Sequence, residues 1–406
     1  MKIAVIGGGA SGMMAAVAAA SEGADVFIVE QKERIGKKLL STGNGRCNFT
    51  NLRQEPVFYH SENTQFPWHI IEKFHAQDAI SFFLQLGVYS RNKDGYLYPH
   101  SNQASAVLDA FRMELERLHV EIKTQTKCLE ILPSKKNFCI RTDKGNLYAD
   151  RVILAAGSKA APFTGSDGSG YTLAKQLGHR IVPVLPALVQ LHCKETFFKS
   201  LAGIRAEGKV SLYVKDVCIA QETGEIQLTN YGISGIPIFQ VSRYASNALY
   251  HGQEVKAVLN FMPAFSEDTF TAFLTARIQA RPEKTTEEFF IGLFHKNLAQ
   301  LWVKLSGVPR TKKVKDWTKR ELAVFVRLIL HFTVTVTKTN GFEHAQVCAG
   351  GVDTREIDAD TLESLYVPGL YFTGELLDVD GATGGYNLQF CWACGQIAGK
   401  EAAKSA

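Results

Sequence analysis

The sequence predicts an α/β protein in which a parallel sheet, built from both ends of the chain, is interrupted by a β-rich and a helical insertion. A strand, a glycine turn, a helix and a second strand follow one another over residues 2–30. A strand–glycine–helix unit closes the chain at 368–403. Between them the apolar pattern alternates over 187–262 and has a helical period over 266–330.

The first thirty residues carry the strongest pattern. Residues 2–6 are apolar and predict a buried strand, and Gly7-Gly8-Gly9-Ala10-Ser11-Gly12 follows without a spacer. The Ala-rich residues 13–21 predict a helix, and residues 25–29 predict a second strand that ends at Glu30. This order of strand, G-x-G-x-x-G, helix, strand and acid is typical of a Rossmann-like dinucleotide-binding unit.

Each part of this turn has a physical role. Gly7 allows the tight turn, Gly9 lets the backbone approach a pyrophosphate, and Gly12 lets the helix pack on the sheet. The helix start adds N–H groups and a positive dipole end for the phosphates. Glu30, 18 residues after Gly12, has the spacing of an acid that binds ribose hydroxyls, and its charge opposes a 2′-phosphate. The expected ligand is FAD or NAD rather than NADP.

Composition predicts a soluble protein of two or three domains. The chain has 406 residues, of which 46% are hydrophobic and 21% charged, and its net charge of +5 does not by itself indicate nucleic-acid binding. No apolar run approaches the roughly 18 residues that span a bilayer. The glycine turn interrupts the N-terminal apolar run after five residues, unlike the layout of a signal peptide. We expect a cytoplasmic protein without a membrane partner.

The eight cysteines are spread along the chain, and only Cys391 and Cys394 are closely spaced. This density is too low for a disulfide scaffold, and a cytosolic location keeps thiols reduced. One C-x-x-C without a second pair does not make a tetrahedral zinc site, so we expect no metal. The two thiols lie one helical turn apart, which allows a redox pair, but we favour packing as small hydrophobic side chains.

Residues 31–177 extend the first unit. A loop at 41–51 is rich in Gly, Asn and Thr and presents many backbone donors with little bulk. The buried strand that starts at Arg151 ends in Ala155-Ala156-Gly157, a small-residue turn of the kind that passes beside the dinucleotide in FAD proteins. Helices are predicted at 68–74, 78–86, 104–118 and 171–177, a break with His100 at 96–101, and short strands over 120–148.

No second complete dinucleotide fingerprint follows. Residues 165–170 are glycine-rich, but their spacing is wrong and no paired strand and acid come after them. A stable NAD(P)H domain of the disulfide-reductase kind is therefore not expected.

The middle of the chain predicts a β-rich segment with a helical insertion. Residues 209–214 and 217–220 form a hairpin pattern, 225–228 another strand, and 231–237 a glycine-rich break before a helix. Residues 331–338 alternate again and return to the β-rich part.

A basic cluster lies at the end of the helical insertion. Nucleic-acid binding needs aromatic side chains interleaved on the same face, and only Trp317 is close, so we favour a solvated surface. The cluster comprises Arg310, Lys312, Lys313, Lys315, Lys319 and Arg320.

The C-terminal stretch carries the second strong signal. Residues 368–380 predict a strand that runs into a turn of glycine and acids, and Gly384 and Gly385 precede a helix to about Ala403. A glycine pair at a helix start presents N–H groups and a positive dipole end. Such a start would stabilise the negative charge of a reduced flavin, which favours FAD over NAD.

Several segments together resemble the BaiN and aminoacetone-oxidase type of FAD flavoprotein, a bacterial NAD(P)/FAD-dependent oxidoreductase family. The motifs are Gly7–Gly12, GKKLLSTGNGRCNFTN (36–51), VILAAG (152–157), GISG (232–235), AGGV (349–352) and GLYFTGELLDVDGATGGYNLQ (369–389). The resemblance implies a glutathione-reductase-like FAD domain, an inserted β-barrel and a small helical domain. The expected boundaries are 1–190 and 343–406 for the FAD domain, 191–265 and 331–342 for the barrel, and 266–330 for the helical domain.

The resemblance also implies site residues. The substrate would lie on the open flavin face under 231–234 and 344–351, which makes Tyr231, Ser234, His344 and Cys348 the candidate catalytic residues. The cofactor contacts would be Gly7, Gly9, Ala10, Ser11, Gly12, Glu30, Gln31, Lys38, Thr42, Gly43, Asn44, Arg46, Cys47, Ala156, Gly157, Gly374, Glu375, Asp378, Gly384, Gly385, Tyr386 and Asn387. Family members more often have Thr at position 348 and no paired thiols at 391 and 394.

The expected function is FAD-dependent hydride transfer between a small organic substrate and flavin N5. An amine and an enone are both possible substrates, and O₂ or transiently bound NAD(P)H is the electron partner. The alternative is a flavin-containing binding or regulatory protein whose basic helical domain contacts nucleic acid. Substrate, electron partner and oligomeric state stay open at this point.

Overall fold

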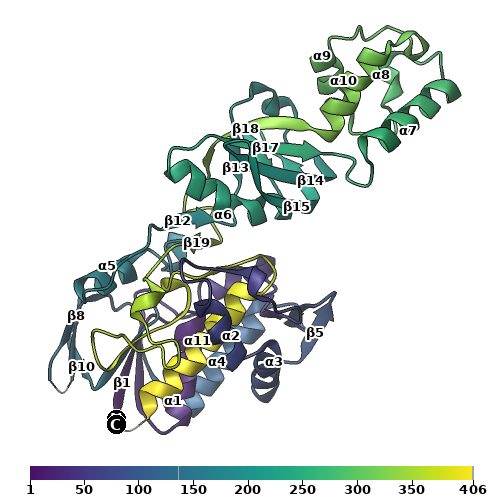
Figure 1. The fold of residues 1–406 in the computed structure, drawn as a ribbon. Coiled ribbons are helices and arrows are strands. Elements are labelled where there is room, and N and C mark those ends of the chain that lie inside the picture. Colours follow the sequence, from purple (N-terminus) through teal and green to yellow (C-terminus); the bar gives the residue numbers. More distant parts are fainter. Residues whose placement is uncertain (136, 405–406) are drawn as a thin grey trace. The chain divides into compact units, whose positions relative to one another are not determined.

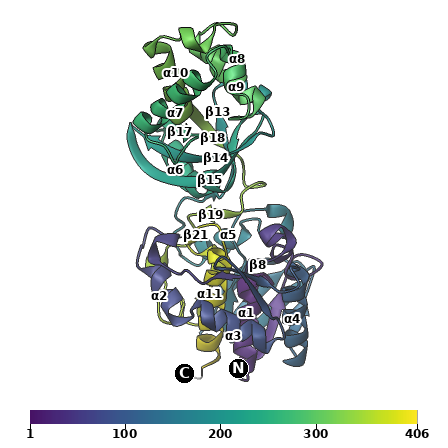
Figure 2. The same ribbon diagram turned by 90° about the vertical axis from the view of Figure 1, so that its right-hand side faces the viewer.

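The computed structural model describes residues 1–135 and 137–404. The chain divides into two compact units, Met1–Ala187 with Phe342–Ala406, and Leu188–Gly341 (Figures 1 and 2). Each unit has its own buried core. The predicted fold class is confirmed, because the first unit has a Rossmann-type sheet and the second contains a closed β-barrel and helices.

A five-stranded parallel sheet forms the centre of the first unit, in the order β20-β11-β1-β2-β7. The sheet joins the two ends of the chain, since β1 comes from the N-terminal segment and β20 from the C-terminal segment. Strand β2, which follows β1 in the sequence, pairs with one side of β1, and β11 pairs with the other side. The order of the strands therefore reverses at β1. The bounds are β1 Lys2–Ile6, β2 Asp25–Val29, β7 Glu121–Lys123, β11 Arg151–Leu154 and β20 Leu370–Phe372.

Helices α1 (Ala10–Ser21) and α11 (Tyr386–Ala403) lie side by side against this sheet (Figures 1 and 2). Two glycines of α11 allow the close approach. A Cβ atom on Gly395 would lie 2.6 Å from the Ser11 carbonyl oxygen, and one on Gly399 would lie 2.4 Å from the Ala15 carbonyl oxygen. The last helix of the chain is thereby held on the first.

The remaining elements of the first unit surround this core. Residues 96–101 were expected to be a break, but Tyr96–Pro99 forms β6, which pairs with β3 and β5. The alternation of Tyr96, Leu97 and Tyr98 favours a strand, and Pro99 ends this strand but does not prevent it. The other bounds are α2 Phe66–Lys73, α3 Ala76–Gln85, α4 Ala104–Arg117, α5 Ser169–Gln176, β3 Thr50–Asn51, β4 Tyr59–His60, β5 Ser90–Lys93, β8 Cys128–Pro133, β9 Phe138–Thr142, β10 Gly145–Ala149, β12 Leu185–Ala187, β19 Val347–Ala349 and β21 Asp380–Gly381.

The second unit contains a closed barrel in the order β13-β16-β15-β14-β17-β18, with α6 (Ile236–Tyr250) packed against it. Two predictions for this part were wrong. The expected hairpin arm and separate strand are one continuous strand, β15 (Val217–Leu228), because its polar middle pairs with β14 through backbone bonds. The expected break contains β16 (Gly232–Ser234). The other strands are β13 Leu191–Cys193, β14 Arg205–Val214, β17 Val255–Asn260 and β18 Phe332–Thr339.

Four helices form the helical part of the second unit. Ser266, Thr285 and Thr318 cap α7, α8 and α10 through their side-chain oxygens. The aromatic side chains of Trp302, Phe290 and Phe325 are fully buried within it. Among the described residues, no helix combines the length and apolar character that crossing a membrane requires. The bounds are α7 Glu267–Ala280, α8 Thr286–Phe289, α9 Lys296–Ser306 and α10 Lys319–Leu330.

Candidate functional site

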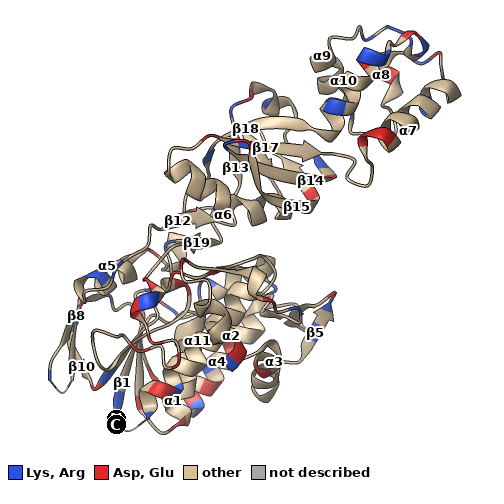
Figure 3. Cartoon of the chain, in the orientation of Figure 1, with Lys and Arg blue, Asp and Glu red and all other residues tan. Residues whose placement is uncertain are grey.

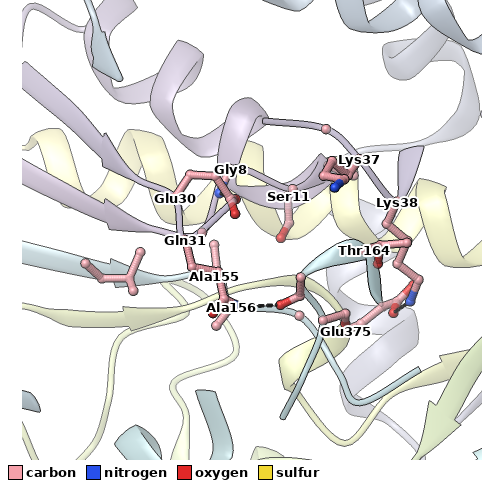
Figure 4. Close-up of a pocket in the computed structure, with 18 of the residues that line it drawn as sticks. Gly8, Ser11, Glu30, Gln31, Lys37, Lys38, Ala155, Ala156, Thr164 and Glu375 are labelled. Carbon is pink, nitrogen blue, oxygen red and sulfur yellow. Dashed lines mark hydrogen bonds and ion pairs between the residues drawn. The ribbon is translucent and has the colours of Figure 1, made fainter. Parts of the chain in front are cut away.

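A cleft opens in the first unit at the carboxyl ends of β1, β2 and β11, beside the point where the strand order reverses (Figure 4). Ligands of open α/β sheets bind at this edge. The walls are the loop after β1, residues 34–42, residues 126–128, the small residues 155–157, the segment 164–169, and single residues of the C-terminal segment that include Glu375 and Cys391.

The glycine turn is built as the sequence predicts. Gly7 has a φ of 110°, and a Cβ atom there would lie 2.4 Å from the Ala155 carbonyl oxygen. A Cβ atom on Gly12 would lie 2.0 Å from the Gly7 carbonyl oxygen, so α1 can leave the sheet only from a glycine. A Cβ atom on Gly9 meets nothing within 4 Å, and Gly9 lines the cleft. The backbone is therefore open to a ligand at Gly9.

Glu30 is held in place by backbone donors. Its Oε2 accepts a hydrogen bond from the Gly8 N–H at 2.9 Å, and its Oε1 accepts one from the Lys32 N–H at 2.8 Å. Burial raises the pKa of the Glu30 carboxyl, and these N–H groups oppose that shift. Each oxygen keeps a second lone pair for a ribose hydroxyl.

A charged contact closes the other end of the cleft. The Lys38 ammonium lies 2.5 Å from Glu375 Oε2, and the Ser158 hydroxyl donates to the same oxygen at 2.9 Å. Figure 4 shows the Lys38 side chain directed toward Glu375. On the opposite wall, Gln31 Nε2 donates to the Gly165 carbonyl oxygen at 2.6 Å. Three distant chain segments thus meet at one carboxylate.

The thiols near the cleft are free and buried. Burial raises the pKa of Cys391, which lines the cleft, well above its ordinary value, and raises that of Cys394 as well. Burial also raises the pKa of Cys348 to about 11. Since the thiolate is the reactive form, we expect these thiols to react slowly at neutral pH.

The loop before α11 is fixed by its own hydrogen bonds. The Asn387 side chain accepts from the Gly381 N–H and donates to the Gly381 carbonyl oxygen, both at 2.8 Å. Asn51 Nδ2 donates to the Gly384 carbonyl oxygen at 3.0 Å. The Tyr386 ring stacks on Phe58 with a centroid distance of 4.6 Å. The loop is thereby tied to residues 50–60.

Asp378 is a buried carboxyl in the same loop. Its Oδ2 accepts hydrogen bonds from the Glu62 N–H at 2.8 Å and the Ser61 hydroxyl at 3.3 Å. Burial raises the pKa of Asp378 to about 6, and the neighbouring Asp380 and Glu62 charges add to the shift. It therefore titrates close to neutrality.

The structure brings half of the predicted cofactor contacts together in one cleft and places the others behind or beside it. Lining the cleft are Gly7, Gly9, Ala10, Ser11, Glu30, Gln31, Lys38, Thr42, Ala156, Gly157 and Glu375. Outside its lining are Gly12, Gly43, Asn44, Arg46, Cys47, Gly374, Asp378, Gly384, Gly385, Tyr386 and Asn387.

Sequence reasoning missed two segments of the wall. Residues 126–128 reach the cleft because β7 pairs with β2 and ends at the same edge of the sheet. Residues 164–169 precede α5 and contribute Thr164, Ser166 and Ser169. Their glycine-rich sequence was the available signal, although its spacing did not match a known fingerprint.

The four candidate catalytic residues are divided between the units. His344 is exposed and Cys348 is buried in the first unit. Ser234 is buried in β16 of the second unit. Tyr231 is partly exposed, its ring stacks on His192, and its hydroxyl accepts a hydrogen bond from Asn340 Nδ2 at 3.0 Å.

The cleft fits a dinucleotide cofactor on the chemistry of its walls. Open backbone at Gly9, the helix start at Ala10 and Ser11, and the Glu30 carboxylate match a pyrophosphate and a ribose.

Comparison with known proteins places the chain in a family. The family model described as the HI0933-like protein Rossmann domain matches residues 1–401. The 3-dehydro-bile acid delta(4,6)-reductase of Clostridium scindens is 45% identical to the chain over 405 residues, and the match covers 99% of each protein. The ribosomal RNA dihydrouridine synthase of Haemophilus influenzae is 28% identical over 397 residues, with 96% of this chain and 95% of that protein covered. The enzyme of the same name from Escherichia coli is 28% identical over 400 residues, with 97% and 96% covered.

Solved structures include one of similar size. The 3-ketosteroid-delta4-(5alpha)-dehydrogenase of Rhodococcus jostii RHA1 matches with a TM-score of 0.49 and 14% identity, over 99% of this chain and 96% of that protein. The family match confirms the resemblance predicted from the motifs, and with it FAD as the cofactor and oxidoreduction as the class of reaction. The chain belongs to the HI0933-like family of Rossmann-domain flavoproteins.

Proposed function

We propose that the protein is an FAD-dependent reductase that adds hydrogen across a C=C bond conjugated to a carbonyl group. The observation that carries this proposal is the 45% identity, over the whole chain, to a protein named as a reductase of a 3-dehydro compound at its delta(4,6) bonds. The relatives named dihydrouridine synthases support the same chemistry, because uridine becomes dihydrouridine when a ring C=C bond next to a carbonyl is saturated. None of these three relatives is named for amine oxidation, the other expectation.

Bound FAD would supply hydride transfer between an external donor and the substrate. The chain's own residues bind and orient. Gly9 and the start of α1 would hold the pyrophosphate, Glu30 the adenosine ribose, and Lys38 the part of the cofactor next to Glu375. The neutral, buried thiols of Cys391 and Cys394 leave the reaction without a competing thiolate.

Reduction of a conjugated C=C bond also needs a proton. Of the four candidate catalytic residues, we favour Tyr231 as the donor. Its hydroxyl oxygen already accepts a hydrogen bond from Asn340, so its own proton is free to point toward a substrate. Ser234 and Cys348 are buried, and His344 stays a further candidate.

The proposed hydride donor is NADPH or NADH, bound transiently, since the chain has no second dinucleotide fingerprint. O₂ would then reoxidise the flavin only as a side reaction. A cyclic enone of the steroid kind is the first candidate substrate, because the more similar relative is named a 3-dehydro-bile acid delta(4,6)-reductase.

A uracil ring in ribosomal RNA is the second candidate substrate. One observation favours it beyond the relatives' names. The unit 188–341 carries 20 Lys and Arg against 13 Asp and Glu, a formal net charge of +7, whereas the rest of the chain carries 25 against 27. A positively charged insertion in a chain that is otherwise slightly negative is the charge distribution expected of an RNA-binding insertion.

Anaerobic stopped-flow spectroscopy tests the proposal. The flavin band should bleach with NADPH or NADH and return when a 4-ene-3-keto steroid or a purified large-subunit ribosomal RNA is added. The steroid and the RNA are added in separate experiments, so that each candidate substrate is tested by itself. Bleaching by aminoacetone, with reoxidation by O₂ alone, would overturn the proposal in favour of an oxidase.

A further inference from the structure

A groove of mixed polar and apolar lining runs through the second unit, between helices α7 and α10 and strands β14, β17 and β18. It encloses about 780 Å³ and lies entirely within residues 188–341. The groove is distinct from the FAD cleft, which belongs to the first unit. Its walls are Tyr213, Val258, Glu267, Thr271, Thr275, Lys319, Leu322, Ala323, Val326, Arg327, His331 and Thr333.

One edge of the groove carries two cations on α10. Lys319 and Arg327 lie eight residues apart, with Ala323 midway between them, and therefore share a face, and His331 lies four residues further on, just beyond the helix. At 1.5 Å per residue, Lys319 and Arg327 are about 12 Å apart along the axis. Figure 3 shows the positive segments on α10.

These two cations are not neutralised by the protein. Within residues 1–135 and 137–404, neither Lys319 nor Arg327 forms an ion pair, and both are exposed. The neighbouring basic residues differ, since Arg310 pairs with Glu287, Lys312 with Glu321 and Lys315 with Glu283. The basic cluster predicted to be a solvated surface is thus in part an ion-pair network.

A single acid lines the groove. Glu267, at the start of α7, forms a hydrogen bond with His331, and the distance from Glu267 Oε1 to His331 Nε2 is 2.8 Å. The side chains of Thr271, Thr275 and Thr333 also line the groove, but the Thr275 hydroxyl donates to the Thr271 carbonyl oxygen at 2.8 Å and the Thr333 hydroxyl donates to the His331 carbonyl oxygen at 3.2 Å. The groove therefore offers two free cations, and the whole unit has a net charge of +7.

We propose that this groove binds the sugar–phosphate backbone of a folded RNA, with Lys319 and Arg327 contacting different phosphates. A 12 Å separation along the helix, as estimated above from its rise, suits a chain of phosphates better than one small anion. The cations would fix the position of the RNA, while the sequence is read elsewhere. The inference rests on the second candidate of the proposed function, the ribosomal RNA uracil.

The test compares two double variants of the FAD-loaded protein with equal changes in charge. Lys319→Gln with Arg327→Gln removes the groove cations, and Lys199→Gln with Lys304→Gln removes two exposed cations of the same unit outside the groove. Filter binding to purified large-subunit ribosomal RNA is measured from 50 to 200 mM salt. The groove variant should bind about tenfold more weakly and lose about 2 from the salt slope, roughly 1 per phosphate contact, while the control changes less than about twofold.

Two further measurements make the result decisive. FAD content and thermal unfolding verify that both variants fold. Turnover of the enone should be the same in the two double variants. If the unmodified protein does not turn over the enone, that result contradicts the enone as substrate but leaves the proposal for the groove unaffected. Equal losses of RNA affinity in the two variants, or equal affinity for heparin and RNA, would overturn the groove proposal.

Discussion

The Lys38 ammonium lies 2.5 Å from the Glu375 carboxylate, although 337 residues separate them in the sequence. Both side chains are largely buried, with exposed fractions of 24% and 16%. The contact joins the N-terminal and C-terminal parts of the candidate cofactor cleft, and Ser158 from a third segment donates to the same carboxylate. The N-terminal and C-terminal segments therefore form one site only after the chain has passed through the inserted unit and returned to the first unit.

Lys38→Met should weaken FAD binding by about 10- to 100-fold. Removing the cation leaves the Glu375 carboxylate largely buried with the Ser158 hydroxyl as its remaining side-chain partner, at a cost of about 1–3 kcal/mol. Fluorescence titration of the flavin-free protein measures the affinity. Lys73→Met is the matched control, because Lys73 pairs with Asp360 at a similar exposure of 30% away from the cleft. An equal loss in the control would refute a specific role of Lys38.

Alanine at Gly9 and at Gly12 should fail in different ways. A Cβ atom at Gly12 collides with the Gly7 carbonyl oxygen at 2.0 Å, so Gly12→Ala should lower the free energy of unfolding by about 1–3 kcal/mol or more. A Cβ atom at Gly9 has open space, so Gly9→Ala should fold normally but lose FAD affinity. Urea unfolding of the flavin-free forms, together with FAD titration, separates these outcomes. Normal FAD binding by Gly9→Ala would place the pyrophosphate elsewhere.

Much of this site was predictable because its signals are local. The order β1, Gly7–Gly12, α1, β2 and Glu30 depends on hydrophobic period and on glycine, both readable within thirty residues. Residues 126–128 gave no such signal, since the pairing of β7 with β2 brings them to the cleft. The prediction divided strand β15 because Gln221–Gly224 breaks the apolar alternation, whereas the backbone of these residues pairs with β14. The sequence pattern therefore did not reveal which strands pair over long distances in the sequence.

Asp378 should make stability fall as pH rises from about 4 to about 6. Its pKa is raised to about 6, above an unfolded value near 3.9, so the folded state holds the proton more tightly in this window. Asp378→Asn should remove this dependence and stabilise the flavin-free protein at pH 8 by about 1–3 kcal/mol. Urea unfolding at several pH values measures the difference.

Asp360 serves as the control for this titration, because its pKa is shifted in the opposite direction. Ion pairing with Lys73 and His69 lowers the pKa of Asp360 to about 2. Its contribution is present above pH 4 and is lost as pH falls toward 2, so Asp360→Asn should destabilise the protein at pH 8. Parallel behaviour of the two variants would contradict the assignment of Asp378.

Cys391 and Cys394 should resist alkylation in the folded protein. Both are buried and their pKa values are raised by burial, whereas Cys218 is exposed. Mass spectrometry after brief iodoacetamide treatment at pH 7.5 should find label on Cys218 and none on the pair. Cys394→Ala should leave flavin reduction by NADPH unchanged. A disulfide between the pair in the purified protein would instead establish a redox role.

Tyr231→Phe should slow the oxidative half-reaction at least about 100-fold, the usual contribution of a general acid. Reduction of the flavin by NADPH should not change, because that step transfers no proton to the substrate. Asn340 donates to the Tyr231 hydroxyl at 3.0 Å and bonds to His192 through its Oδ1 at 2.5 Å, so Asn340→Ala should cause a smaller loss in the same step. Tyr250→Phe, an exposed tyrosine of the same unit, is the control. An equal loss in both half-reactions would mean that Tyr231 acts through folding or FAD binding, and the proton donor would then be sought at His344.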